Sequence, residues 1–158
     1  MRPATLEPGA GWDVSYNLKM ELSSDPGLLR VVRSAVEQLA QELGLDEAEC
    51  RRVTLAVDEA ITNIIRHAYQ NQPGQPIEIT CSRHGAGGDG PDRLEILLQD
   101  RGRAVDPSEL HGRPLDEIRP GGLGLHLIRE VMDEVEYQRE GQTNQLRLVK
   151  YLRGKDSG

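Results

Sequence analysis

The chain has 158 residues, the size of one domain and long enough to bury a hydrophobic core without disulfides or structural metal. Its 26 acidic and 19 basic side chains give a net charge of -7, which disfavours direct nucleic-acid binding. No apolar run approaches the roughly 20 residues of a membrane-spanning helix, and residues 1–11 lack the character of a secretion signal. We expect a single cytoplasmic domain over residues 1–158, with no contact to nucleic acid or membrane.

The cysteine and aromatic content restricts the core. Cys50 and Cys81 are the two cysteines of the chain, and their separation builds neither a disulfide framework nor a paired-cysteine metal site. Phenylalanine is absent and aromatic residues make up 3% of the chain. The core must therefore rest on leucine, isoleucine and valine, and we expect both thiols to be ordinary core atoms.

The first half of the chain predicts one strand followed by two helices. Apolar and polar residues alternate over residues 14–22, the period of a half-buried strand. Asp25 followed by proline predicts the start of a helix that ends at Gly44. Asp46, with glutamate three positions later, resembles a capping box, and the apolar series behind it predicts a second helix that continues to Tyr69.

The second half predicts four strands and a third helix, with a long loop before that helix. The loop, residues 100–121, has no periodic apolar pattern and exceeds the usual loop length, which marks a functional segment such as a lid. The order βααββαββ favours an α+β two-layer sandwich, because three amphipathic helices need one sheet face to cover. The predicted elements of this half are strands 77–82 and 93–99, joined by a glycine-rich loop at 85–92, a helix from Gly122 to Val131, and strands 135–139 and 146–152.

One pair of polar residues stands out on the second predicted helix. Glu59 and Asn63 are four residues apart, so both side chains project from the same helix face. Magnesium takes one or two protein oxygens and completes its shell with water and phosphate, so Asn63 can be a ligand while Glu59 acts as a base. The same spacing also occurs on solvated helix flanks, and the pair alone does not decide between these readings.

Two further segments have the chemistry of a ligand site. Asp100 ends a predicted strand and Gly102 follows two residues later; a carboxylate there accepts hydrogen bonds from an exocyclic amine such as that of adenine, although a simple turn also fits. Residues 121–125 combine three glycines with the start of a helix, where free amides and the helix dipole attract phosphate. Neither a P-loop nor a Rossmann fingerprint is present.

Taken together, these segments resemble the motifs of the GHKL, or Bergerat-fold, ATPases. The pattern Glu-Ala-x-Thr-Asn-x-x-x-His-Ala-Tyr is similar to the N box in the form found in the anti-sigma-factor serine/threonine kinases. The two glycine-containing segments are similar to the family's first and second glycine boxes. The matching segments are 57–69, 100–102 with Asp106 and Pro107, 121–125, 132–137 and 144–150, within a domain core of about residues 14–152.

The resemblance implies a histidine-kinase-like ATPase domain, with a mixed, mostly antiparallel sheet covered on one face by three helices. It implies that ATP and Mg(II) bind, that Asn63 coordinates the Mg(II), that Glu59 is the catalytic base and that Asp100 holds the adenine amine. An ATP lid would extend over about residues 101–120. The remaining nucleotide-binding positions that it implies are Gly102, Gly122, Leu123, Gly124 and Leu125.

The resemblance also implies partners and an activity. Members of this branch bind a sigma factor and, in competition with it, a STAS-domain antagonist that they phosphorylate on serine or threonine; they form homodimers. We therefore expect an ATP-dependent serine/threonine protein kinase that acts as an anti-sigma factor in partner switching.

Two departures from the family pattern keep other functions open. Ala104 stands where some relatives have a second glycine, and Arg147 lies in the last strand where many carry a small hydroxyl residue near the nucleotide. These departures motivate a non-catalytic nucleotide-binding module that sequesters a protein partner. A third alternative is a slow ATPase in which Glu59 activates water.

Overall fold

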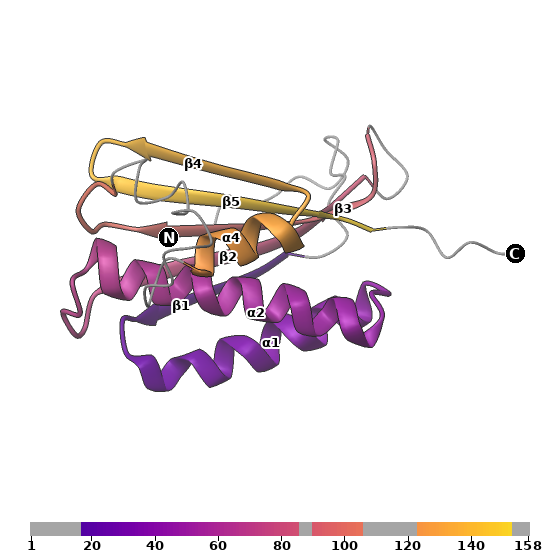
Figure 1. The fold of residues 1–158 in the computed structure, drawn as a ribbon, viewed down its shortest axis with the longest axis horizontal. Coiled ribbons are helices and arrows are strands. Elements are labelled where there is room, and N and C mark those ends of the chain that lie inside the picture. Colours follow the sequence, from indigo (N-terminus) through magenta and orange to yellow (C-terminus); the bar gives the residue numbers. More distant parts are fainter. Residues whose placement is uncertain (1–16, 86–89, 106–122, 153–158) are drawn as a thin grey trace, which may run out of the picture.

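The computed structural model describes residues 17–85, 90–105 and 123–152 of the chain. Helices α1, α2 and α4 lie on one face of a five-stranded sheet and form a two-layer molecule (Figure 1). The predicted α+β sandwich, with three helices over one sheet face, is confirmed. The elements are β1 (Asn17–Ser23), the 3₁₀ turn η1 (Pro26–Leu28), α1 (Leu29–Glu42), α2 (Glu47–Asn63), the π-helical turn η2 (Ile64–Ala68), β2 (Pro76–His84), β3 (Arg93–Asp100), α4 (Leu123–Val131), β4 (Glu134–Glu140) and β5 (Thr143–Tyr151).

The sheet has the order β1-β2-β3-β5-β4, and all four pairings between the described strands are antiparallel. The mixed, mostly antiparallel sheet implied by the resemblance is in this part of the chain antiparallel throughout. The last strand begins at Thr143, earlier than the predicted start at Leu146, because a buried asparagine takes an inward position before the first leucine. Residues 14–16 of the predicted first strand lie outside the described ranges.

Alternation along the strands separates an apolar face, under the helices, from a polar face. On β2 the buried residues Ile77, Ile79 and Cys81 point toward the helices, while the residues between them are half-buried on the other face. The period-2 side-chain alternation of a strand produces this division. Both cysteines are buried and free, as predicted, and burial raises the pKa of Cys81 to about 12.

The helix starts follow their capping residues. Asp25 accepts a hydrogen bond from the Gly27 amide at 2.9 Å, but it caps the short turn η1, so α1 proper begins at Leu29, three residues after Pro26. Asp46 accepts from the Glu49 amide at 2.8 Å and caps α2 as predicted. None of the helices in the described ranges is long and apolar enough to cross a membrane.

The second helix changes its winding at Asn63. A continuous α-helix to Tyr69 was expected, but α2 ends at Asn63 and residues 64–68 form the π turn η2. The Tyr69 amide donates to the carbonyl oxygen of Ile64 at 2.9 Å, which closes the wider turn. An apolar stripe does not distinguish a π turn from an α turn over so few residues, so the pattern did not reveal the change. Single π turns inside helices occur often at functional sites.

Candidate functional site

The site begins on the last two turns of α2. Glu59 and Asn63 are both half-buried and lie one turn apart on the same helix face, as their spacing predicted. Their neighbours Ala60 and Ile61 are fully buried against the core. The helix therefore holds the two polar groups at the border between the core and the surface.

Asn63 has a buried oxygen that is not satisfied. Its Oδ1 is inaccessible to solvent and accepts no hydrogen bond from any described residue. An amide oxygen left in this state costs on the order of 1–3 kcal/mol, so a buried orphan of this kind needs an explanation such as an ion or a ligand. A hard cation prefers an amide oxygen as a ligand, so Asn63 fits the Mg(II) that the resemblance implies. Among the described residues no cluster of three or more histidine, cysteine or acidic side chains is present to hold a metal, so a cation here would need phosphate and water oxygens.

The two consecutive acids of α2 have different environments. Asp58 accepts a hydrogen bond from Arg33 Nε on α1 at 2.7 Å and is tied into the contact between the two helices. Glu59 makes no hydrogen bond or ion pair within the described part of the chain. Of the two carboxylates, Glu59 is the one available to accept a proton.

Asp100 ends β3 and is 5% exposed. Its Oδ1 accepts hydrogen bonds from the Gly102 amide at 2.9 Å and from Asn144 Nδ2 at 2.8 Å. Burial raises the pKa of the Asp100 carboxyl above the usual aspartate range, and the hydrogen bonds from Asn144 and Gly102 and the charge of Arg139 oppose this rise. The Oδ2 atom accepts no hydrogen bond from the described residues, which leaves one carboxylate oxygen for a ligand.

The loop after Asp100 packs directly onto η2. The Arg103 amide donates to the Ala68 carbonyl oxygen at 2.9 Å, and Arg103 Nε donates to the carbonyl oxygen of His67 at 2.7 Å. The Arg101 amide donates to the hydroxyl of Tyr69 at 2.8 Å. These contacts join the segment that contains Asp100 to the end of the helix that carries Asn63.

Gly102 allows this close approach. A Cβ atom at this position would lie 2.5 Å from the carbonyl oxygen of Ala68 and 2.6 Å from its Cβ. No side chain fits there without moving the backbone. The predicted role of Gly102, a close backbone path, thus has a structural basis in the contact with η2.

The third predicted segment is described only from Leu123, where α4 begins; Gly121 and Gly122 lie outside the described ranges, as do residues 106–120 of the predicted lid. The start of α4, the end of β3 and the end of α2 lie at the same end of the molecule (Figure 1). The glycine run therefore precedes a helix at the predicted position. The contacts of Leu123, Gly124 and Leu125 with the nucleotide stay a prediction.

Sequence reasoning assigned no role to the buried polar residue opposite Asp100. Asn144 is 2% exposed and bonds to Asp100, to the Arg103 carbonyl oxygen at 2.9 Å and, through its own Oδ1, to Tyr137 and Arg139 on β4. The signal was present, because Asn144 precedes Leu146 and Leu148 at the inward positions of β5. A polar residue in such a series is buried, and a buried polar residue requires partners.

The structure places Arg147, one of the two departures from the family pattern, away from the helix-face site. Arg147 lies on the sheet face opposite the helices, where its guanidinium bonds to Glu95 at 3.1 Å and to Glu136 at 3.4 Å. It alternates with the inward residues of β5 and cannot reach the side of Asn63 and Glu59. The other departure, Ala104, is exposed in the loop after β3.

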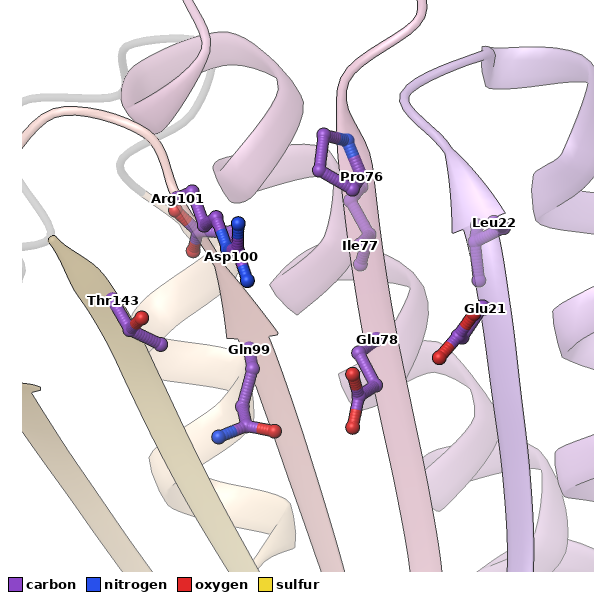
Figure 2. A pocket seen from close by; sticks show the side chains of 9 residues that line it. All are labelled: Glu21, Leu22, Pro76, Ile77, Glu78, Gln99, Asp100, Arg101 and Thr143. Atoms are coloured by element: carbon purple, nitrogen blue, oxygen red, sulfur yellow. The ribbon is translucent and has the colours of Figure 1, made fainter. Parts of the chain in front are cut away.

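A pocket on that open face of the sheet does not contain the predicted catalytic residues. Its volume is about 450 Å³, and Figure 2 shows Glu21, Glu78, Gln99 and Thr143 standing on the open side of the strands, with the helices behind. Asp100 is its only member among the predicted site residues, and Glu59 and Asn63 are not among its lining. We therefore do not identify this pocket with the nucleotide site.

The arrangement on the helix face has a defined chemistry. It combines an unsatisfied amide oxygen on Asn63, an uncommitted carboxylate on Glu59, and a buried carboxylate on Asp100 with one oxygen available. Phosphoryl transfer requires mainly positioning and electrostatic stabilisation, and these groups supply a metal ligand, a base and an acceptor for an amine.

Comparison with known proteins identifies an ATPase-domain family whose model matches most of the chain. Residues 22–150 match the model of the histidine kinase-like ATPase domain. The serine-protein kinase RsbW of Bacillus pumilus is 30% identical over 129 residues, which cover 77% of this chain and 77% of that protein. The serine-protein kinase RsbW of Bacillus subtilis is 28% identical over 145 residues, 87% of this chain and 86% of that one.

Two solved structures share the fold. The RsbU and RsbW domains of Rv1364c from Mycobacterium tuberculosis superimpose with a TM-score of 0.62 at 17% identity, and the match covers 87% of this chain and 33% of that longer one. The SiaB-SiaC complex from Pseudomonas aeruginosa gives a TM-score of 0.62 at 14% identity, covering 87% of this chain and 89% of that one. At these identities the likeness concerns the fold alone.

Proposed function

Because this chain belongs to the histidine kinase-like ATPase domain family, in the branch of the RsbW serine-protein kinases, we propose that it is an ATP-dependent kinase that phosphorylates serine or threonine of a protein partner. The single observation that carries the proposal is the pair on α2: an orphaned buried oxygen on Asn63 and, one turn earlier, the uncommitted carboxylate of Glu59.

The residues divide the work of phosphoryl transfer. Asp100 would accept a hydrogen bond from the adenine amine through Oδ2, and Asn63 Oδ1 would hold the cation. Mg(II), when bound there, neutralises charge on the phosphates. Glu59 takes the proton of the attacking hydroxyl while the new oxygen–phosphorus bond forms and the bond between the β- and γ-phosphates breaks. Gly102, and the residues Gly122, Leu123, Gly124 and Leu125 before and in the first turn of α4, provide backbone contacts to the nucleotide, and residues 101–120 form its lid.

The proposed partners follow the relatives. We place the chain in a partner-switching system in which it sequesters a sigma factor and phosphorylates a STAS-domain antagonist. We further propose that the domain comprises residues 1–158, acts in the cytoplasm and forms a homodimer, which sedimentation equilibrium would measure. The -7 net charge agrees with protein partners rather than direct contact with nucleic acid.

A second candidate is a nucleotide-binding module that sequesters a partner without phosphorylating it. Arg147 was one of the two departures from the family pattern that motivated this second function. It lies on the far side of the sheet and does not disturb the helix-face site, so it no longer supports the second function. The exposed Ala104 is the departure that still supports it. The two functions differ in one product, a phosphorylated partner.

The test uses γ-labelled ATP, magnesium and purified STAS-domain proteins. We expect label on a serine or threonine of one of them, and we expect Glu59→Gln to lower the transfer rate by about 10²- to 10⁴-fold with unchanged ATP affinity, because the base acts only in the transition state. Asp58→Asn is the matched control: it removes the neighbouring charge, disturbs an ion pair with Arg33, and should leave transfer intact.

The results identify the catalytic base and distinguish the kinase from the sequestering module. Retained transfer in Glu59→Gln would assign the base to another residue. Tight ATP binding with no labelled acceptor would favour the sequestering module.

A further inference from the structure

A buried asparagine on β5 joins the end of β3 to the loop that follows it. The antiparallel register places Asn144 directly opposite Asp100. Nδ2 of Asn144 donates to Asp100 Oδ1 at 2.8 Å and to the carbonyl oxygen of Arg103 at 2.9 Å. One amide nitrogen therefore bonds to the carboxylate and to the loop at the same time.

Two side chains of β4 fix the orientation of this amide. Oδ1 of Asn144 accepts from the Tyr137 hydroxyl at 2.6 Å and from Arg139 Nη1 at 2.8 Å. A guanidinium only donates, whereas a carboxylate and a carbonyl only accept. The oxygen of Asn144 must therefore face β4 and its nitrogen must face Asp100.

The same two side chains also hold the loop. Arg139 Nη1 donates to the carbonyl oxygen of Gly102 at 3.1 Å, and the Val105 amide donates to the hydroxyl of Tyr137 at 3.3 Å. Residues 102–105 are thus bonded on one side to β4 and β5. On the other side, Arg103 bonds to the carbonyl groups at the end of η2.

We propose that Asn144 is a positioning residue for nucleotide binding: supported by Tyr137 and Arg139, it fixes the Asp100 carboxylate and residues 102–105 relative to each other. This inference rests on the proposed function, in which Asp100 binds the adenine amine. Asn144 and the Gly102 amide both donate to Oδ1 of Asp100. The Asp100 carboxylate is therefore oriented with Oδ2 available to the adenine amine. Asn144 itself acts through Asp100, since its own polar atoms are already bonded within the protein.

The most informative variant is Asn144→Asp. It keeps the shape and the acceptor toward β4 but replaces the donor that faces Asp100 by a second carboxylate. At pH 8 the two carboxylates repel each other, and we expect the ATP·Mg affinity to fall about tenfold or more. As the pH falls, one of them takes a proton and becomes a donor again, so the affinity of this variant should rise. The ATP·Mg affinity of the wild type should instead decrease as the pH falls, because protonation of Asp100 removes the acceptor for the adenine amine.

The charged and titratable groups around this pair are few among the described residues. Arg139 and Tyr137 face it from β4, and Tyr69 with the Arg101 backbone lies beyond Asp100 at the end of η2. Arg139 is a permanent cation and lowers the pKa of Asp100. It stabilises one added negative charge but makes no bond that replaces the lost Nδ2 donor.

The experiment measures affinities for ATP·Mg and GTP·Mg by calorimetry at pH 6, 7 and 8, with thermal unfolding of every variant. Asn144→Leu should weaken ATP·Mg binding by about tenfold and reduce the preference for ATP over GTP. Tyr137→Phe keeps Asn144 and its bond from Arg139 but removes the bond from the Tyr137 hydroxyl, and it should weaken binding by about threefold. Gln138→Ala, on the open face of the same strand and exposed, is the matched control and should bind like the wild type.

The outcomes separate this inference from the proposed function. If the wild type binds no adenine nucleotide, the proposed function fails. If the wild type binds but Asn144→Leu and Tyr137→Phe bind equally well, the positioning role is overturned while the function stands. If the Asn144 variants do not fold, the threefold loss in Tyr137→Phe decides, and its absence overturns the inference.

Discussion

Asp100 carries two opposing demands. It lies almost fully buried at the end of β3, and burial disfavours the ionised form, yet binding an adenine amine requires an acceptor. The protein meets both demands with donors, because Asn144, the Gly102 amide and the charge of Arg139 each favour the carboxylate. The balance still leaves the pKa of Asp100 above the usual aspartate range.

This raised pKa predicts an acid limit to nucleotide binding. The ionised form binds, so ATP affinity should be full at neutral pH and should fall as the pH drops through the raised pKa, at a higher pH than an ordinary aspartate would give. Calorimetric titration with ATP·Mg from pH 8 down to pH 4 measures the limit. Asp100→Asn should bind weakly at every pH and lose this dependence. An affinity that is constant down to the ordinary aspartate range would remove Asp100 from the site.

The contact between the loop after β3 and η2 is the feature that assembles the site from separate elements. Asn63 ends α2, η2 follows at once, and the Ala68 carbonyl at its end bonds to Arg103. Gly102 permits this contact because its Cα lies against Ala68 with no space for a side chain. The segment that contains Asp100 is thereby attached to the turn that follows Asn63.

Gly102→Ala should therefore separate the loop from η2. The added methyl would meet backbone atoms of Ala68 at 2.5 and 2.6 Å, and overpacking of this kind costs about 1–3 kcal/mol. We expect a lower unfolding midpoint and an ATP affinity reduced by about tenfold or more. Thermal unfolding and calorimetry measure the two effects.

Gly44→Ala is the control for this variant. Gly44 follows α1 with a φ of 89° and has open space around it, so alanine there is strained and lowers stability by about 1 kcal/mol without touching the site. ATP affinity equal to the wild type in Gly102→Ala would show that the close approach is only a packing feature.

Parts of this assembly were predictable from local patterns. The spacing of Glu59 and Asn63 predicted a shared helix face, and alternation predicted the strands that the structure confirms. The π turn was not predictable, since its apolar residues point inward in either winding. Asn144 was readable as a polar residue in an inward series, but its partners on β4 required the sheet order, which no local pattern contains. The outward position of Arg147 was also readable from the sequence, because Arg147 alternates with Leu146 and Leu148 on the predicted strand.

At the scale of the whole molecule, the proposed site residues lie toward one end of the helix layer. The ends of α2 and β3 and the start of α4 lie toward this end, and the buried hydrophobic core fills the space between the helices and the sheet (Figure 1). The family assignment and this geometry agree on a histidine kinase-like ATPase domain. The central claim is that this end binds ATP with a cation on Asn63.

The most direct test of that claim is calorimetry of ATP binding with and without magnesium, on the wild type, Asn63→Ala and Asn63→Asp. We predict saturable binding to the wild type that strengthens when magnesium is present. Asn63→Ala should lose at least about tenfold in affinity with magnesium and little without it, since it lacks only the ligand oxygen. Asn63→Asp retains an oxygen and should retain most of the effect. Binding that is absent in the wild type, or that magnesium strengthens equally in Asn63→Ala, would contradict the account.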